Sequence, residues 1–151
     1  MDTESLLKSL NAHEVEYVVI GATAFPVHGY SRATLDIDIF IRPTEENCRK
    51  TWQALNDFGY DMTDVSVLEM QSNKILIRQY LVETDIHPYV KGITFDEIWK
   101  NKITAKIGDT DSFFASLDDL IKMKKAAGRE KDKEDLRILE KLRQKKQAKS
   151  D

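Results

Sequence analysis

The chain has 151 residues, and its 23 Lys and Arg residues against 26 Asp and Glu residues give a formal net charge of −3. With 41% hydrophobic and 32% charged residues it can close a hydrophobic core, which excludes a largely disordered chain. Its one cysteine, Cys48, excludes an intrachain disulfide scaffold and, without His and Cys partners at ligand spacing, a zinc site.

The first half of the chain alternates helical and extended patterns. Apolar spacing and capping residues predict a helix with Thr3 as N-cap and a longer helix between Thr44, as N-cap, and Gly59. Gly21-Ala22 breaks a buried strand and opens a short helix. In order, the expected elements are helix 4–12, strand 17–20, short helix 23–28, strand 35–41 and helix 44–58.

The second half predicts a hairpin, further short strands and two helices. Gln71 to Asn73 supplies turn residues between two extended runs, and Ser116 followed by Asp119 approximates a capping box. In order, the expected elements are strands 65–70, 74–81 and 85–89, a helical turn at 95–99, extended segments 104–107 and 112–115, and helices 116–127 and 131–145. This mixture indicates an α+β fold, a mixed β-sheet with helices on one main face and a C-terminal helical pair.

The length suits a single domain over residues 1–151, with a frayed basic tail at about 146–151. No apolar run reaches the ~20 residues that a membrane span needs. The N-terminus carries Asp2 and Glu4 where a signal peptide has a basic start, so we expect a cytoplasmic protein that does not enter a membrane. Residues 122–149 hold twelve basic against five acidic residues, a charge balance suited to phosphate-bearing partners or to a solvated helix face.

Three aspartates stand out as candidate metal ligands. Asp36 and Asp38 are two positions apart on a predicted strand, so both carboxylates point to the same side of the sheet. Like charges at close range favour a cation between them, and oxygen ligands favour Mg²⁺ or Mn²⁺. Asp85, on a separate predicted strand, offers a third carboxylate, and three carboxylates on one sheet face can hold two metal ions. Acidic residues on a solvated strand face are the alternative.

A glycine turn upstream offers a phosphate contact. Gly21 follows an apolar strand and opens a helix, which lets backbone N–H groups approach a phosphate closely, although many such glycines serve only as turns. The sequence then reads VIGATA at 19–24, HG at 28–29 and RATLDID at 32–38. A second block reads Lys124, AGR at 127–129, KD at 131–132 and DL at 135–136.

Together these blocks resemble the DNA polymerase β-like nucleotidyltransferase superfamily, in particular its small branch related to abortive-infection, toxin-type proteins and minimal bacterial nucleotidyltransferases. The resemblance implies that Asp36, Asp38 and Asp85 are catalytic and bind two metal ions. It also implies that the backbone of Gly21 and Ala22 contacts the nucleotide phosphates and that Lys124 and Arg129 neutralise phosphate charge. Ala22 stands where this superfamily usually has Ser or Gly, so only its backbone N–H is left to make that contact.

The resemblance implies transfer of a nucleoside monophosphate from a nucleoside triphosphate to a hydroxyl acceptor, which in this superfamily is an RNA, a protein side chain or a small molecule. A partner chain, as in a toxin–antitoxin pair, is a further expectation. The alternative is a non-catalytic, antitoxin-like module that binds nucleotide or RNA through the basic C-terminal helix. A third hypothesis is a dimer that pairs through Leu136, Leu139 and Leu142.

Overall fold

The computed structural model describes residues 2–32, 34 and 36–150. Six α-helices and six strands lie within these residues, joined in places by short 3₁₀ helices. The helices are α1 (Thr3–Ala12), α2 (Glu45–Phe58), α3 (Val67–Ser72), α4 (Phe95–Asn101), α5 (Leu117–Ala127) and α6 (Lys133–Ser150). The strands are β1 (Tyr17–Ile20), β2 (Asp36–Ile41), β3 (Ile75–Ile77), β4 (Glu83–His87), β5 (Ile103–Ile107) and β6 (Thr110–Phe114). The 3₁₀ helices are η1 (Gly21–Ala24), η2 (Pro26–His28) and η3 (Glu130–Asp132).

All six strands form one mixed sheet in the order β3-β4-β2-β1-β6-β5. The central strand β2 runs antiparallel to β1 and parallel to β4. This register sets Asp38 opposite Ile20 on one side and opposite Asp85 on the other. The predicted α+β class with a mixed sheet is therefore confirmed.

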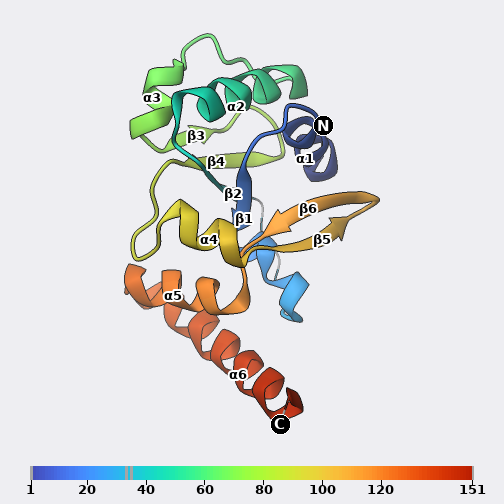
Figure 1. Cartoon of the computed structure of the whole chain (residues 1–151), viewed down its shortest axis with the longest axis vertical. Helices are drawn as coiled ribbons and strands as arrows, with labels where there is room; N and C mark the ends of the chain where they lie inside the picture. The colour runs from blue at the N-terminus through green and yellow to red at the C-terminus, as the bar shows by residue number, and fades with distance from the viewer. Residues whose placement is uncertain (1, 33, 35, 151) are drawn as a thin grey trace.

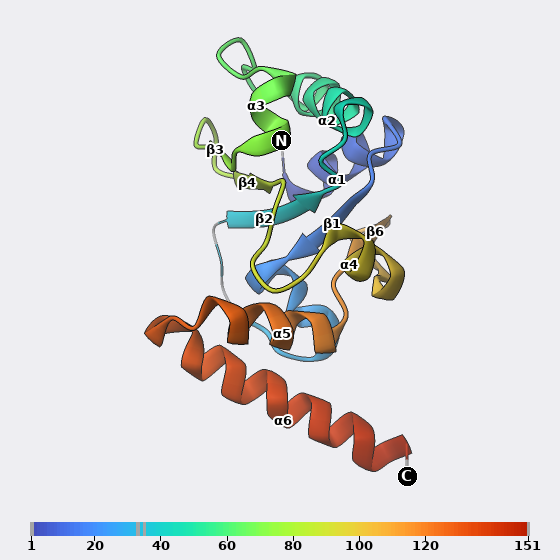
Figure 2. The same ribbon diagram turned by 60° about the vertical axis from the view of Figure 1, so that its left-hand side comes forward.

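Alternation along β2 separates an apolar face of the sheet from an acidic one. Ile37, Ile39 and Ile41 are almost completely buried, on the face that α1 and α2 cover. Figures 1 and 2 show α5 and α6 on the opposite side of the sheet, where they form the C-terminal helical pair. The short α4 also belongs to that side, because the Phe95 ring packs edge-on against Phe40, whose side chain shares the face of Asp38.

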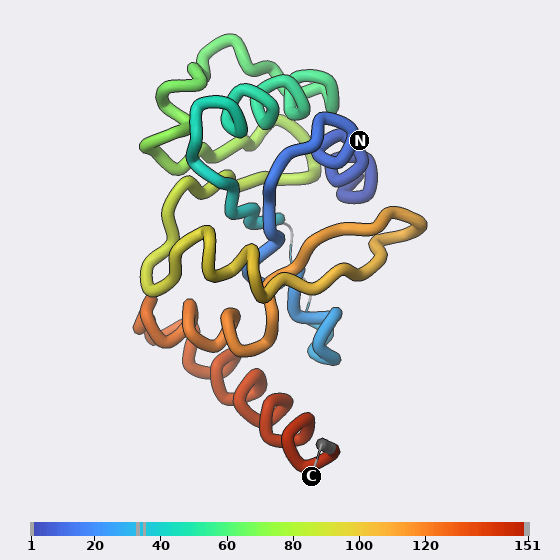
Figure 3. The backbone as a smooth tube through the Cα atoms, viewed as in Figure 1, coloured from blue at the N-terminus to red at the C-terminus, as the bar shows by residue number. Residues whose placement is uncertain are grey.

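The N-terminal helix also anchors a distant hairpin. The tube in Figure 3 shows the turn between β5 and β6 beside α1. The Glu4 carboxylate accepts hydrogen bonds from the Asp109 backbone N–H at 2.8 Å and from the Thr110 hydroxyl at 2.9 Å. These bonds lower the pKa of Glu4 from its usual value, because they favour the charged form.

Several predicted boundaries are confirmed by their capping bonds. The hydroxyl of Thr44 accepts from the Asn47 backbone N–H, and that of Ser116 accepts from Asp119, so both are N-caps as predicted. The first helix begins one residue earlier than expected, because Asp2 rather than Thr3 is its N-cap. The predicted start of the second strand at residue 35 lies outside the described residues.

The predicted strand 65–70 is wrong. Val67–Ser72 forms the helix α3, which begins where the Ser66 hydroxyl accepts the Glu69 backbone N–H. This bond caps the N-terminus of the helix. Met70 is the buried residue of α3, so Val65 and Val67 do not lie on the buried face of a strand as their alternation suggested. The strand expected over 74–81 shrinks to Ile75–Ile77, which still pairs antiparallel with β4.

The last helix is longer than expected, since α6 continues through Ser150 rather than ending at Lys145. Leu139 is fully buried, and Leu136 and Leu142 pack against the chain's own core. The leucines that suggested a helix-paired dimer are thus already used within the chain. Among the described residues, no helix is both long and apolar enough to cross a membrane.

The buried Cys48 generates a prediction about thiol reactivity. Its side chain is fully buried in α2, and burial raises the pKa of the thiol to about 11. At pH 8 the native thiol should react with a disulfide reagent at least about a hundredfold more slowly than the thiol of the denatured chain, because the thiolate is the reactive form. Absorbance of the released chromophore measures both rates. Equal rates in buffer and in denaturant would show that Cys48 is exposed.

Candidate functional site

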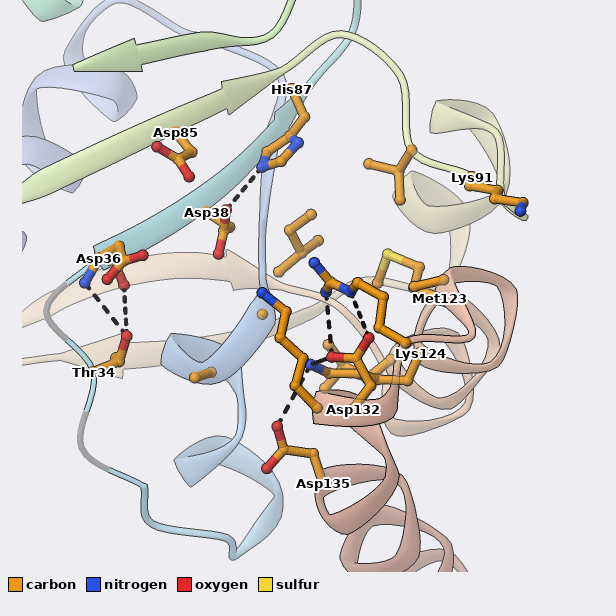
Figure 4. Close-up of a pocket in the computed structure, with 18 of the residues that line it drawn as sticks. Thr34, Asp36, Asp38, Asp85, His87, Lys91, Met123, Lys124, Asp132 and Asp135 are labelled. Carbon is orange, nitrogen blue, oxygen red and sulfur yellow. Dashed lines mark hydrogen bonds and ion pairs between the residues drawn. The ribbon is translucent and has the colours of Figure 1, made fainter.

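A cavity of about 920 Å³ opens between the acidic face of the sheet and the α5–η3 segment. Figure 4 shows Asp38, Asp85 and His87 on the sheet side and Lys124, Asp132 and Asp135 on the helical side. All seven site residues expected from the sequence line this cavity: Gly21, Ala22, Asp36, Asp38, Asp85, Lys124 and Arg129. They come from η1, β2, β4 and the α5–η3 segment, so folding gathers residues that are distant in sequence.

The parallel pairing of β2 and β4 brings two of the three aspartates together. Asp38 lies directly opposite Asp85, and ligand atoms of Asp38, Asp85 and His87 all lie within 4.8 Å of one another. Asp36 is two pairs further along the ladder, opposite Glu83, and does not belong to this group although it lines the same cavity. The clustered donor set is thus two carboxylates and an imidazole rather than three carboxylates.

His87 is held against Asp38. The imidazole Nε2 lies 2.8 Å from Asp38 Oδ1, and Figure 4 draws this bond. Burial by itself raises the pKa of Asp38, but the hydrogen bond from His87 and the positive charges of His87 and Lys74 outweigh it and hold the pKa below its usual value. Asp38 therefore stays ionised in a partly buried position.

Asp85 has two basic partners that the sequence reasoning missed. Its carboxylate is only 6% exposed, and Arg78 Nη1 lies 2.7 Å from its Oδ1. Lys74 Nζ lies 3.8 Å from the other oxygen, Oδ2. Nothing in the local pattern at residues 74–78 indicates this pairing, because it depends on the antiparallel contact of β3 with β4. His87 was detectable, since it shares the alternation of Asp85 on one strand.

Gly21 is required at the turn from β1 into η1 for two reasons. Its φ of +72° is in the left-handed region that side chains disfavour, and a Cβ built on it would lie 2.7 Å from Asp38 Oδ2. The backbone of this turn therefore passes directly against the carboxylate. Any side chain here would separate the backbone N–H groups from a ligand held at Asp38.

The predicted basic residues belong to a network of ion pairs. Lys124 Nζ lies 2.9 Å from Asp132 Oδ1 and 3.5 Å from Asp135 Oδ2, and Arg129 Nε lies 2.7 Å from Asp132 Oδ2. Asp132 and Asp135 are 3% and 4% exposed, so these are inward-facing carboxylates rather than surface partners. Burial by itself raises the pKa of Asp132, but the hydrogen bonds and charges of Arg129 and Lys124 outweigh it and lower the pKa.

The same network ties the loop before β2 to the helical pair. Arg32 Nη1 lies 2.7 Å from Asp135 Oδ2, and the Tyr30 hydroxyl donates to Asp135 Oδ1 at 2.9 Å. Three cations, Arg32, Lys124 and Arg129, thus meet two carboxylates, which leaves this wall of the cavity with a surplus positive charge. A negatively charged ligand is favoured on this side and a divalent cation on the sheet side.

A comparison with protein families gives this arrangement a context. The family model described as "Nucleotidyltransferase of unknown function (DUF6036)" matches residues 2–144, and the chain belongs to this family. No curated protein matches the sequence significantly.

The turn at Gly21 generates a prediction with a matched control. Gly21→Ala should lower the free energy of unfolding by about 2 kcal/mol, from the positive φ together with the contact at Asp38, as measured by urea denaturation. Gly29→Ala, also at positive φ (+97°), would meet Leu142 at 3.9 Å and no closer atom of the described residues, so it should cost less, about 1 kcal/mol. If both variants lose the same free energy of unfolding, the close contact between residue 21 and Asp38 does not affect stability.

Proposed function

We propose that this member of the nucleotidyltransferase family transfers a nucleoside monophosphate from a nucleoside triphosphate to a hydroxyl group of an acceptor. The reaction would depend on Mg²⁺ or Mn²⁺, with two ions expected. One observation carries the proposal: a single cavity is lined by a carboxylate pair on one wall, a surplus of positive charge on the other, and a glycine turn beside the carboxylates.

The donor set suits a divalent cation. Asp38, Asp85 and His87 offer two carboxylate oxygens and one ring nitrogen within 4.8 Å, and Asp36 adds a carboxylate on the same cavity wall. Carboxylates accept both Mg²⁺ and Mn²⁺, and an imidazole nitrogen favours Mn²⁺ over Mg²⁺. When bound, such an ion would withdraw charge from a phosphate oxygen and from the attacking hydroxyl.

The remaining residues would position the triphosphate. Gly21 and Ala22 bring backbone N–H groups to the cavity wall without a side chain at the point of closest approach. Arg32, Lys124 and Arg129 already pair with the carboxylates of Asp132 and Asp135, so they would offer the phosphates a surplus of one positive charge rather than three. Such fixed charges stabilise the transition state of phosphoryl transfer.

The bond changes follow from these positions. The acceptor oxygen forms a bond to the α-phosphorus, the bond from that phosphorus to the oxygen bridging the β-phosphate breaks, and pyrophosphate leaves. The proton of the acceptor hydroxyl passes to a carboxylate, for which Asp85 is the proposed recipient. His87 would act as a positioning residue that orients Asp38.

The acceptor would be an RNA, a protein side chain or a small molecule, and a partner chain would present it if the protein belongs to a toxin–antitoxin pair. Because nucleoside triphosphates are cytoplasmic metabolites, the proposal includes a cytoplasmic location.

Thermal unfolding tests the nucleotide site without knowledge of the acceptor. Each of the four nucleoside triphosphates is added with Mg²⁺ or with chelator. The correct nucleotide at ~100 times its dissociation constant should stabilise the protein by about 2.7 kcal/mol, a rise of several degrees in Tm, and only with metal. Asp38→Asn should abolish the rise, whereas Asp64→Asn, an exposed control outside the cavity lining, should keep it. A rise that survives chelator and Asp38→Asn would contradict the proposed metal site.

A second candidate function is a non-catalytic, antitoxin-like module that binds RNA. Arg137, Lys141, Lys145 and Lys149 are all exposed and follow one another at four-residue spacing on α6. Residues four apart lie on the same helix face, so these side chains form a basic stripe along α6. A stripe of this kind suits a phosphate backbone.

Salt dependence tests this alternative. If α6 binds RNA, fluorescence anisotropy with a labelled single-stranded RNA should show affinity that falls steeply with salt. The triple variant K141Q/K145Q/K149Q should then reduce the slope of log K against log salt by about 2. On this alternative, binding is unaffected by Asp38→Asn. A slope unchanged by the triple variant would argue against α6 as the RNA-binding surface.

A further inference from the structure

The two basic partners of Asp85 hold it in different ways. Arg78 donates at 2.7 Å to Asp85, lies 3.5 Å from Glu83 and also donates to the carbonyl of Ile77 at 3.2 Å. These three contacts fix the guanidinium in place. Lys74, at 3.8 Å from Asp85, is beyond hydrogen-bond distance, so its attraction to the carboxylate is purely Coulombic.

Lys74 also differs from Arg78 in its access to ligand. Its side chain is half exposed and lines the same cavity as Asp38 and Asp85, whereas Arg78 is absent from the described lining of that cavity. The charge of Lys74 acts on Asp38 as well as on Asp85. A flexible four-carbon stem lets a lysine ammonium move to a new partner, while a guanidinium held by several bonds stays.

The negative charge of the carboxylate pair is therefore partly offset before any ligand arrives. Asp38 and Asp85 contribute two negative charges, and Lys74 and Arg78 contribute two positive ones. Arg78 is shared with Glu83, and Asp36 lines the same cavity, so a bare divalent cation is still attracted here, but less strongly than by an unpaired carboxylate pair. If Lys74 moved away, the pair would regain one negative charge, and a triphosphate in the cavity would offer the ammonium a stronger anionic partner.

We propose that Lys74 couples metal binding to triphosphate binding: it occupies the charge position beside Asp38 and Asp85 until a triphosphate arrives, and then turns to the phosphates and yields that position to the metal ion. This inference rests on the proposed function and adds an order of binding to it. The metal enters with the triphosphate rather than before it. Lys74 is thus a positioning residue, and its effect has opposite signs for the two ligands.

Two binding measurements on Lys74→Gln test whether Lys74 opposes binding of the bare metal ion and favours binding of the triphosphate. Electron paramagnetic resonance of free Mn²⁺ gives the affinity for the bare ion, which should be about tenfold tighter than in the wild type because one opposing charge is gone. Calorimetry with the preformed complex of Mn²⁺ and inorganic tripolyphosphate, which carries three phosphates and no base, should show about tenfold weaker binding. Neither measurement depends on catalytic activity.

Two control variants test whether the effect depends on the position of the Lys74 charge or on any positive charge in the cavity. Lys91→Gln removes the same charge from a residue that lines the cavity, but Figure 4 places Lys91 well away from Asp85, so bare Mn²⁺ affinity should change little. Lys74→Arg keeps the charge and should restore most of the wild-type behaviour. Circular dichroism and Tm confirm that each variant is folded.

The outcomes separate this inference from the proposed function. Tighter binding of bare Mn²⁺ together with weaker binding of the tripolyphosphate complex in Lys74→Gln supports the coupling. If Mn²⁺ binds the wild type, Asp38→Asn abolishes it and Lys74→Gln leaves both affinities unchanged, the coupling is wrong and the metal site stands. If Lys74→Gln shifts both affinities in the same direction, Lys74 is not a placeholder. If neither wild type nor Lys74→Gln binds Mn²⁺, the proposed metal site fails and the coupling fails with it.

Discussion

The close placement of two carboxylates, the partly buried Asp38 and the buried Asp85, is the constraint on which the rest of the site depends. Parallel pairing of β2 with β4 sets them opposite each other, where like charges repel. In the described structure the repulsion is relieved by His87 on one carboxylate and by Arg78 and Lys74 on the other. Each of these partners comes from β4 or from the β3 segment beside it, so the edge of the sheet supplies the charges that its centre requires.

On the opposite wall of the cavity, carboxylates relieve the repulsion between clustered cations. There Asp132 and Asp135 are buried among Arg32, Lys124 and Arg129, which would otherwise repel one another. Leaving a buried charge without its partner is strongly destabilising, so these pairs tie α5, η3 and α6 to the loop that leads into β2. The C-terminal helical pair is thereby fixed over the acidic face, and the two charged walls stand at a set separation that suits an anionic ligand accompanied by a cation.

Sequence patterns predicted helix boundaries correctly where the capping bond joins residues close together in the chain. Thr44 and Ser116 cap helices through bonds to residues only three positions away, and both were predicted correctly. The same kind of bond, in which the Ser66 hydroxyl accepts the Glu69 backbone N–H, begins α3 where the alternating valines had predicted the strand 65–70. The expected third partner of the carboxylate cluster was Asp36, and the register of the ladder supplied His87 instead.

The sequence by itself determined the α+β class and the acidic strand with its glycine turn, because strand alternation and turn chemistry are local properties, and it identified seven of the residues that line the cavity. Only the tertiary structure decided which of those residues touch. The pairing of Asp38 with Asp85 across 47 positions, and the placing of Lys74 and Arg78 against Asp85, depend on strand order and register. Register is set by how the whole sheet buries its apolar face against α1 and α2, a long-range energy that no short segment of the chain contains.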